Sequence, residues 1–379
     1  MKIAVDGQLM VGHRTGMGTY AFNILRYWNE KRDKIIIYVP GQPPQDLKEL
    51  ARNKGFTIRI LPEANYFKWE QILLPKYVKK DKVDILWCPY CTAPIFPPCP
   101  ISAVIHDTIY MEVKLKSAPT MYKKLGLMYR RLTAPVAARK ANTVATVSEY
   151  AKKQVCYYFP ITKRKISVVP NGVDPSIGLS EAEKKDFFEK NEIDGKYILG
   201  FGSLEARKNS ISLIKAYEKL NNVIKREYKL VLFGFRGYEE SIDKKYIESH
   251  NLSDRIISLG YISDKEKKTL YENCSVFVFP SLSEGFGIPL LEAFDSEAPV
   301  ITSNVTSLPE VAGNGAILVK PTSINEISKG ITRILTDNQY AMSLVRNGKK
   351  QVEIYRWKSA SEKMQRLIHS KEKSKCTQS

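Results

Sequence analysis

Short apolar runs alternate with amphipathic stretches along almost the whole chain, and this alternation limits the fold more than any other feature of the sequence. In the first half the runs occupy residues 2–5, 35–39, 57–60, 85–87, 103–105 and 144–147. Because they are short, apolar and without polar alternation, they predict parallel strands buried on both faces, with helices such as residues 20–28 between them. The first half is therefore predicted to be a doubly wound α/β domain.

The alternation begins again after Pro170-Asn171-Gly172, with runs at residues 197–201, 230–233, 256–259, 276–279 and 300–301. A chain of 379 residues is too long for one ordinary domain, and the Pro and Asn-Gly signals mark a turn or linker. We therefore predict two domains, residues 1–172 and 173–357. Ligands of open α/β sheets lie beyond the carboxyl ends of the strands, so we expect the two domains to face a shared cleft.

Positive charge is concentrated in the first half. The net charge is +19, and residues 1–172 carry 28 Lys and Arg against 12 Asp and Glu, whereas the remainder carries 31 against 28. This asymmetry predicts an anionic partner for the first half, such as nucleic acid, a phosphorylated lipid or a membrane surface.

The segment 113–148 contains no acidic residue. It predicts a basic amphipathic helix on an anionic bilayer, although an ordinary core-facing helix with a solvated basic face stays open. Its cations are Lys114, Lys116, Lys123, Lys124, Arg130, Arg131, Arg139 and Lys140, interleaved with Met121, Tyr122, Leu125, Leu127, Met128, Tyr129 and Leu132.

Neither a signal peptide nor a membrane span is expected. Met1 leads directly into an apolar strand, which predicts a cytoplasmic protein. The charge-free stretch 85–105 is long enough to span a bilayer, but it contains five prolines, which would interrupt a helix repeatedly.

The pair Cys88 and Cys91 matches a redox motif, and Cys99 and His106 would complete a possible zinc set. The prolines that follow forbid the helix that would lower the pKa of the first thiol. Buried free thiols at a strand end are the preferred interpretation.

The most informative segment runs from Pro280 to Glu292, after an apolar run and before a helix. Gly285 and Gly287 allow the backbone to approach a ligand, Pro289 suits a first helical turn, and the N–H groups of the helix start can face an anion. Glu284 in the loop and Glu292 in the first helical turn could converge on polyol hydroxyls. A tight turn and a helix-dipole role are the structural alternatives.

Three further segments end predicted strands or open predicted helices. Arg207 and Lys208 follow Gly202 and precede a helix, where two cations suit a diphosphate leaving group. Gly16-Met17-Gly18 lies before an amphipathic helix and is weak evidence alone, because a plain turn would explain it. His106 ends the run 103–105, where a parallel sheet presents ligand-facing residues.

Together these segments resemble the retaining glycosyltransferase family 4 of the GT-B class, which has a Glu-x7-Glu motif, from Gly16 to Trp357. The resemblance implies the GT-B architecture, two Rossmann-like domains facing a cleft, with the C-terminal segment 358–379 crossing back to the first domain. It implies catalytic roles for Glu284 on the sugar 3- and 4-hydroxyls, for Arg207 and Lys208 on the diphosphate, and for His106 on the transferred sugar. Donor-binding residues would be Gly16, Met17, Gly18, Gly202, Gly285, Phe286, Gly287, Ile288 and Glu292, the last on the ribose.

The resemblance further implies transfer of a hexose, preferably mannose from GDP-mannose, to a saccharide or polyprenyl-diphosphate-linked acceptor in lipopolysaccharide O-antigen or other cell-surface polysaccharide synthesis. No Asp-x-Asp motif stands at a strand end, so no metal and no cofactor are expected. The enzyme would be peripheral on the inner face of the cytoplasmic membrane. Transfer from UDP-glucose, UDP-galactose or UDP-N-acetylglucosamine is the alternative. A nucleic-acid-binding protein would leave the glycine, cation and carboxylate motifs unexplained, and a non-catalytic sugar-nucleotide sensor is the remaining rival.

Overall fold

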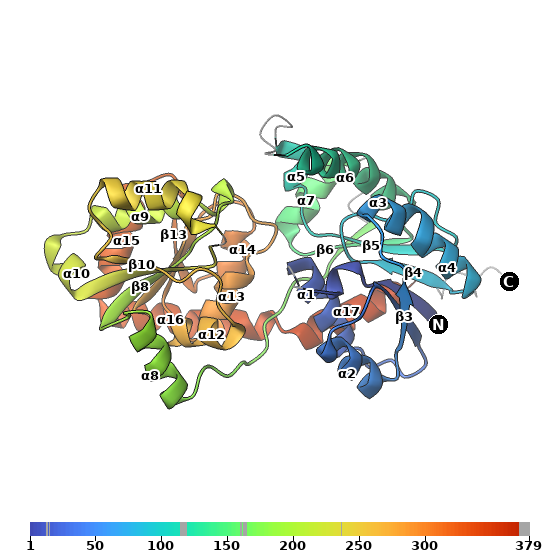
Figure 1. The fold of residues 1–379 in the computed structure, drawn as a ribbon, viewed down its shortest axis with the longest axis horizontal. Coiled ribbons are helices and arrows are strands. Elements are labelled where there is room, and N and C mark those ends of the chain that lie inside the picture. The colour runs from blue at the N-terminus through green and yellow to red at the C-terminus, as the bar shows by residue number, and fades with distance from the viewer. Residues whose placement is uncertain are drawn as a thin grey trace. The chain divides into compact units, whose positions relative to one another are not determined.

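The computed structural model describes residues 1–12, 14, 16–113, 120–159, 161, 165–235 and 237–370. The chain forms two compact units, Met1–Asn171 with Trp357–Ser379 and Gly172–Arg356 (Figure 1). The chain passes into the second unit after Asn171 and returns to the first after Arg356, in each case one residue before the predicted boundary.

The first unit is built on a seven-stranded parallel sheet in the order β3-β2-β1-β4-β5-β6-β7. Its central strands are buried at almost every position, which explains why they read as continuous apolar runs. The strand order reverses between β1 and β4, and this switch point is where such sheets bind ligands. The strands are β1 (Lys2–Asp6), β2 (Lys34–Pro40), β3 (Thr57–Leu61), β4 (Ile85–Cys88), β5 (Ile101–Ile105), β6 (Thr143–Thr146) and β7 (Ile166–Val168).

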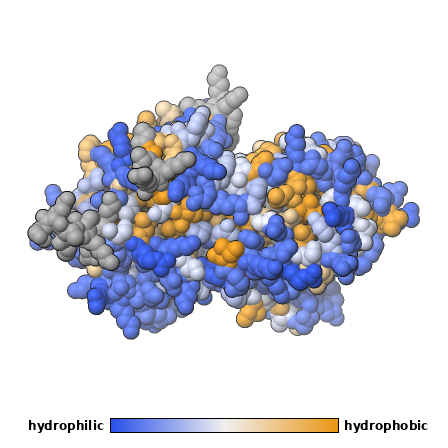
Figure 2. Space-filling view, turned by 180° about the vertical axis from the view of Figure 1, so that it is seen from behind, coloured by the Kyte–Doolittle hydropathy of each residue, from blue (hydrophilic) through white to orange (hydrophobic). Residues whose placement is uncertain are grey.

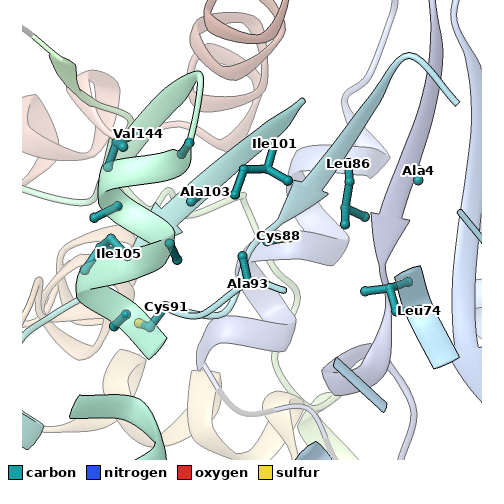
Figure 3. Close-up of a cluster of buried hydrophobic side chains, with 14 of the residues drawn as sticks. Ala4, Leu74, Leu86, Cys88, Cys91, Ala93, Ile101, Ala103, Ile105 and Val144 are labelled. Carbon is teal, nitrogen blue, oxygen red and sulfur yellow. The ribbon is translucent and has the colours of Figure 1, made fainter. Parts of the chain in front are cut away.

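Helices cover both faces of this sheet, and β4, β5 and the turn after β4 pack together in the core shown in Figure 3. Cys88 and Cys91 belong to this core as free, buried thiols, as predicted. Burial raises the pKa of both, that of Cys91 to about 12. The helices are α1 (Gly16–Arg26), α2 (Gln45–Lys54), α3 (Tyr66–Lys68), α4 (Leu74–Lys80), α5 (Ile109–Glu112), α6 (Met121–Lys140) and α7 (Glu149–Tyr158), with a π-helical turn η2 (Trp69–Leu73) between α3 and α4.

The C-terminal helix α17 (Trp357–His369) belongs to the first unit, as predicted, and packs against α1. Ser361 Oγ donates a 2.6 Å hydrogen bond to the Ile24 carbonyl. Gln365 Oε1 accepts from the backbone N–H groups of Asn29 and Glu30, each at 3.2 Å, which satisfies donors that follow the end of α1.

The second unit repeats the plan with six parallel strands in the order β10-β9-β8-β11-β12-β13 and its switch point between β8 and β11. The strands are β8 (Lys196–Phe201), β9 (Tyr228–Phe233), β10 (Ile256–Ser258), β11 (Val276–Phe279), β12 (Val300–Ser303) and β13 (Ala316–Val319). The helices are α8 (Glu181–Lys190), α9 (Ser210–Glu218), α10 (Asn222–Glu227), α11 (Ile242–Ser249), α12 (Asp264–Asn273), α13 (Ile288–Asp295), α14 (Leu308–Ala312), α15 (Ile324–Thr336) and α16 (Asn338–Ile354).

No helix among the described residues is long and apolar enough to cross a membrane. The stretch 85–105 forms β4, β5 and the turns between them, as its prolines require. The face of the molecule in Figure 2 is mainly hydrophilic with smaller apolar areas, which is ordinary for a folded surface.

Candidate active site

The switch point of the second unit brings together three of the predicted catalytic side chains. Arg207 and Lys208 lie on a short 3₁₀ turn, η5 (Ala206–Lys208), after β8, and Glu284 lies in the loop after β11. Arg207 Nη1 lies 2.8 Å from Glu284 Oε2, and Lys208 Nζ lies 2.7 Å from Glu284 Oε1. Each oxygen of one carboxylate therefore holds one cation.

Glu284 is more deeply buried than a loop carboxylate at a cleft is expected to be, with 8% of its surface exposed. Ser281 Oγ donates a further 2.7 Å hydrogen bond to Oε1. Burial alone would raise the pKa of Glu284, but the charges of Lys208 and Arg207 outweigh it, so the pKa lies below its usual value. The carboxylate is ionised and held in one orientation.

The two cations differ in their surroundings. Lys208 is mostly buried and its Nζ lies 5.2 Å from the ring centroids of both Phe201 and Phe279. Arg207 is 30% exposed and also pairs with the exposed carboxylate of Glu205 at 2.7 Å. A ligand can thus reach Arg207 from solvent, while Lys208 supplies a fixed charge from within. This arrangement can neutralise an incoming diphosphate.

The loop between Glu284 and α13 is rigidly fixed. Ser307 Oγ lies 2.9 Å from the carbonyl oxygens of both Glu284 and Phe286. Gly287 has a φ of +112°, which strains any other residue, and a Cβ there would lie 2.7 Å from Leu308 Cδ2, so that methyl group would have to move. Ile288 begins α13 and Pro289 occupies its first turn, as predicted.

Gly202, predicted to bind the donor, has a packing requirement of its own. A Cβ at this position would lie 2.0 Å from the ring of Phe235. The glycine therefore allows the aromatic ring to pack directly on the end of β8.

The prediction that Glu292 lies in the first turn of its helix is wrong. Helix α13 begins at Ile288, so Glu292 is its fifth residue, because Gly287 rather than a later residue is the N-cap. Its Oε1 accepts from Lys267 Nζ at 2.7 Å, and its Oε2 accepts from the Tyr271 hydroxyl at 3.4 Å.

In the first unit His106 follows β5 and is buried. Its Nε2 lies 2.8 Å from the Pro89 carbonyl oxygen, which can only accept, so Nε2 carries the proton. Burial lowers the pKa of His106 to about 4. The ring is therefore neutral near pH 7, and its Nδ1 is left as an acceptor that could receive a sugar hydroxyl.

Gly16, Met17 and Gly18, expected in a loop, instead form the first turn of α1. A Cβ on Gly18 would lie 2.1 Å from the Leu9 carbonyl oxygen, so this glycine lets the helix approach the segment after β1. Met17 Sδ lies 4.0 Å from Cys91 Sγ, beside the turn that holds His106.

Sequence reasoning missed a buried carboxyl pair in the first unit. Asp6 ends β1, and Trp69 Nε1 donates to it at 3.0 Å; the adjacent Glu70 accepts hydrogen bonds from the hydroxyls of Thr92 and Tyr129. Burial raises the pKa of Asp6 to about 6 and that of Glu70 to about 7. The π-helical turn η2 carries both Trp69 and Glu70. Such turns recur at functional sites, but they have no sequence signature that would have revealed this one.

The comparisons with known proteins agree with this geometry. Residues 14–177 match the family described as Glycosyltransferase Family 4, and residues 182–351 match Glycosyl transferases group 1. The chain is 33% identical to an uncharacterised glycosyltransferase of Methanocaldococcus jannaschii over 338 residues, which are 82% of this chain and 84% of that protein. It is 29% identical to the Escherichia coli O-antigen chain mannosyltransferase B over 256 residues, 67% of each chain.

Among solved structures, the fold is similar to that of Anabaena Alr3699/HepE in complex with UDP. The TM-score is 0.74 at 17% identity, covering 98% of this chain and 100% of that one. At this identity the likeness concerns the fold.

Proposed function

Because this chain belongs to the glycosyltransferases of group 1 and family 4, we propose that it transfers mannose from GDP-mannose, with retention at the anomeric carbon, to a growing cell-surface polysaccharide. The observation that carries the proposal is the carboxylate of Glu284 held between Arg207 and Lys208 at the switch point of the second unit. The choice of mannose is supported by the likeness to the Escherichia coli O-antigen chain mannosyltransferase.

In the proposed reaction Arg207 and Lys208 bind the donor diphosphate, and Glu284 accepts hydrogen bonds from the sugar hydroxyls. The bond between the anomeric carbon and the phosphate oxygen breaks, and the electron pair leaves with the phosphate. The two cations stabilise this developing charge. The acceptor hydroxyl attacks the same face, and its proton passes to the departing phosphate oxygen. His106 accepts a hydrogen bond from a hydroxyl of the transferred sugar. No metal ion takes part.

A thermal-shift screen of GDP, UDP and their sugars tests the donor, because a ligand that binds only the folded state raises the melting temperature. We expect GDP-mannose to give the largest shift in melting temperature. In a turnover assay with GDP-mannose, we expect the product to keep the anomeric configuration of the donor. A larger shift with UDP-glucose, UDP-galactose or UDP-N-acetylglucosamine would refute the mannose assignment. Stabilisation by DNA without any nucleotide effect would refute the enzyme assignment.

We also propose that α6 docks on an anionic bilayer at the inner face of the cytoplasmic membrane, where a polyprenyl-diphosphate acceptor presents its head group. The fully buried residues of α6 are small and lie in its C-terminal half, while Leu127 and Tyr129 are half-buried against the core. The fully buried ones are Thr133, Ala134, Ala137 and Ala138. An apolar stripe at helical spacing is exposed instead, formed by Met121, Leu125, Met128 and Leu132, of which Met121 and Leu132 are about 70% exposed.

Exposed cations complement this stripe. Lys123 and Arg130 are exposed and Lys124 is half-buried, while the predicted Lys114 and Lys116 lie outside the described residues. Arg131 has a different use, because its guanidinium donates to the carbonyl oxygens of Tyr110, Met111 and Val113.

Vesicle sedimentation tests the docking. Each cation near an anionic surface contributes about 1 kcal/mol, so replacing Lys123, Lys124 and Arg130 by Gln should weaken binding by about two orders of magnitude. Replacing Lys76, Lys79 and Lys80, exposed on α4, removes the same charge from another site and should weaken it far less. Equal losses would show a diffuse charge effect and refute a docking surface on α6.

A further inference from the structure

Two side chains of the neighbouring helix α12 donate hydrogen bonds to the carboxylate of Glu292 on α13. Lys267 Nζ lies 2.7 Å from Oε1, and the Tyr271 hydroxyl lies 3.4 Å from Oε2. Lys267 and Tyr271 are four residues apart and therefore lie on one face of α12. The two donors approach the two oxygens separately, which fixes both the position and the rotation of the carboxylate.

Lys267 has its principal partner in Glu292. Its other carboxylate, Asp264, lies 3.0 Å away but is 96% exposed, and such surface pairs contribute little. Burial lowers the pKa of Lys267, but the charges of Glu292 and Asp264 raise it more, so the ammonium stays protonated. Tyr271 is fully buried, so its hydroxyl is a fixed donor.

This arrangement leaves acceptor capacity on Glu292. An ionised carboxylate offers about four lone-pair sites, and Lys267 and Tyr271 use one on each oxygen. Glu292 and Lys267 are about one quarter exposed, so the remaining lone pairs are accessible to a ligand. Two adjacent hydroxyls match two oxygens held at fixed positions.

We propose that Lys267 is a positioning residue for donor binding, which holds the Glu292 carboxylate in the orientation that accepts the two hydroxyls of the donor ribose. The inference rests on the proposed function, in which Glu292 binds that ribose. Lys267 itself acts through Glu292. Without it, the carboxylate can rotate about its side-chain bonds, and part of the ribose contribution to affinity is lost as ordering entropy.

Calorimetric titration with GDP and 2′,3′-dideoxy-GDP isolates this effect, or with the UDP pair if the donor screen selects UDP. The readout is the ratio of the two dissociation constants, which reports only the hydroxyl contribution. We expect a ratio on the order of 100 for the wild type, because two hydrogen bonds to a charged group are lost. Glu292→Gln should lower this ratio to roughly 2–5. Lys267→Gln should reduce it about tenfold, with dideoxy-GDP bound as in the wild type.

Two further variants serve as controls. Lys267→Arg keeps the charge and should restore most of the ratio, and Asp264→Asn, which removes only the exposed partner, should leave it unchanged. A Lys267→Gln protein with a lower melting temperature but the wild-type ratio would show a merely structural role and overturn the inference. A wild-type ratio near one would instead remove Glu292 from the ribose and overturn the donor arrangement itself.

Discussion

Replacement of Glu284 by Gln is expected to destabilise the second unit as well as to abolish transfer. The substitution keeps the size of the side chain but leaves Lys208 and Arg207 without their shared negative charge. Removing one partner of a buried ion pair costs about 3–5 kcal/mol. Arg207 is 30% exposed and retains Glu205, so its share is reduced by solvent, and we expect a loss of about 2–3 kcal/mol. For a unit of this size the melting temperature should fall by roughly 5–10 °C.

Scanning calorimetry with and without GDP measures this loss. The diphosphate carries the negative charge that Gln lacks, so GDP should raise the melting temperature of Glu284→Gln by more than that of the wild type. Glu205→Gln is the matched control, because it removes an exposed partner of the same guanidinium. Its unfolding free energy should stay within about 0.5 kcal/mol of the wild type.

Unchanged melting of Glu284→Gln would refute the argument that the two cations depend on this carboxylate. Near-normal turnover in a steady-state assay would separately refute its assignment to the sugar site.

Three other expectations concern catalysis, pH and packing. Arg207→Ala and Lys208→Ala should each reduce the rate about 100-fold or more, while a chelator should have little effect on turnover. Loss of turnover on chelation, with recovery on adding magnesium or manganese, would contradict the metal-free mechanism. Because the pKa of Glu70 is raised to about 7, the folded state holds a proton that the unfolded state releases, so the contribution of this proton to the unfolding free energy is full below about pH 4 and is lost as the pH rises through 7. The unfolding free energy of Glu70→Gln, measured in urea, should therefore depend less on pH between about 5 and 7.5 than that of the wild type, and identical slopes would exclude a titrating Glu70. Gly202→Ala should lower the unfolding free energy by about 1–3 kcal/mol because its Cβ meets the Phe235 ring, whereas Gly126→Ala in α6, where nothing lies within 4 Å, should raise it by about 0.5–1 kcal/mol. Equal changes of the two variants in chemical denaturation would refute the packing argument.

Much of the fold was predictable because its determinants are local. A strand buried on both faces must be apolar throughout, so β1, β4, β8 and β11 are visible as runs in the sequence. The strands β7 and β13 were not predicted. They are short, lie at sheet edges and include half-buried positions, so they lack that signal.

The association of Arg207, Lys208 and Glu284 was also predictable in outline. Each follows a strand of one parallel sheet, and the carboxyl ends of such strands share an edge. That β8 and β11 are direct neighbours, and that Glu284 is buried between both cations, follows from the strand order.

The sequence by itself determined the two α/β units and the residue types at their strand ends, because burial and chain geometry act over a few residues. Only the tertiary structure decided which groups pair. Lys267 meets Glu292, and Glu70 meets Tyr129, from separate helices. It also decided that Met121 and its stripe on α6 face outward. An apolar helical face satisfies the same periodicity whether it meets a core or a membrane, so the outcome depends on which neighbours the rest of the chain supplies.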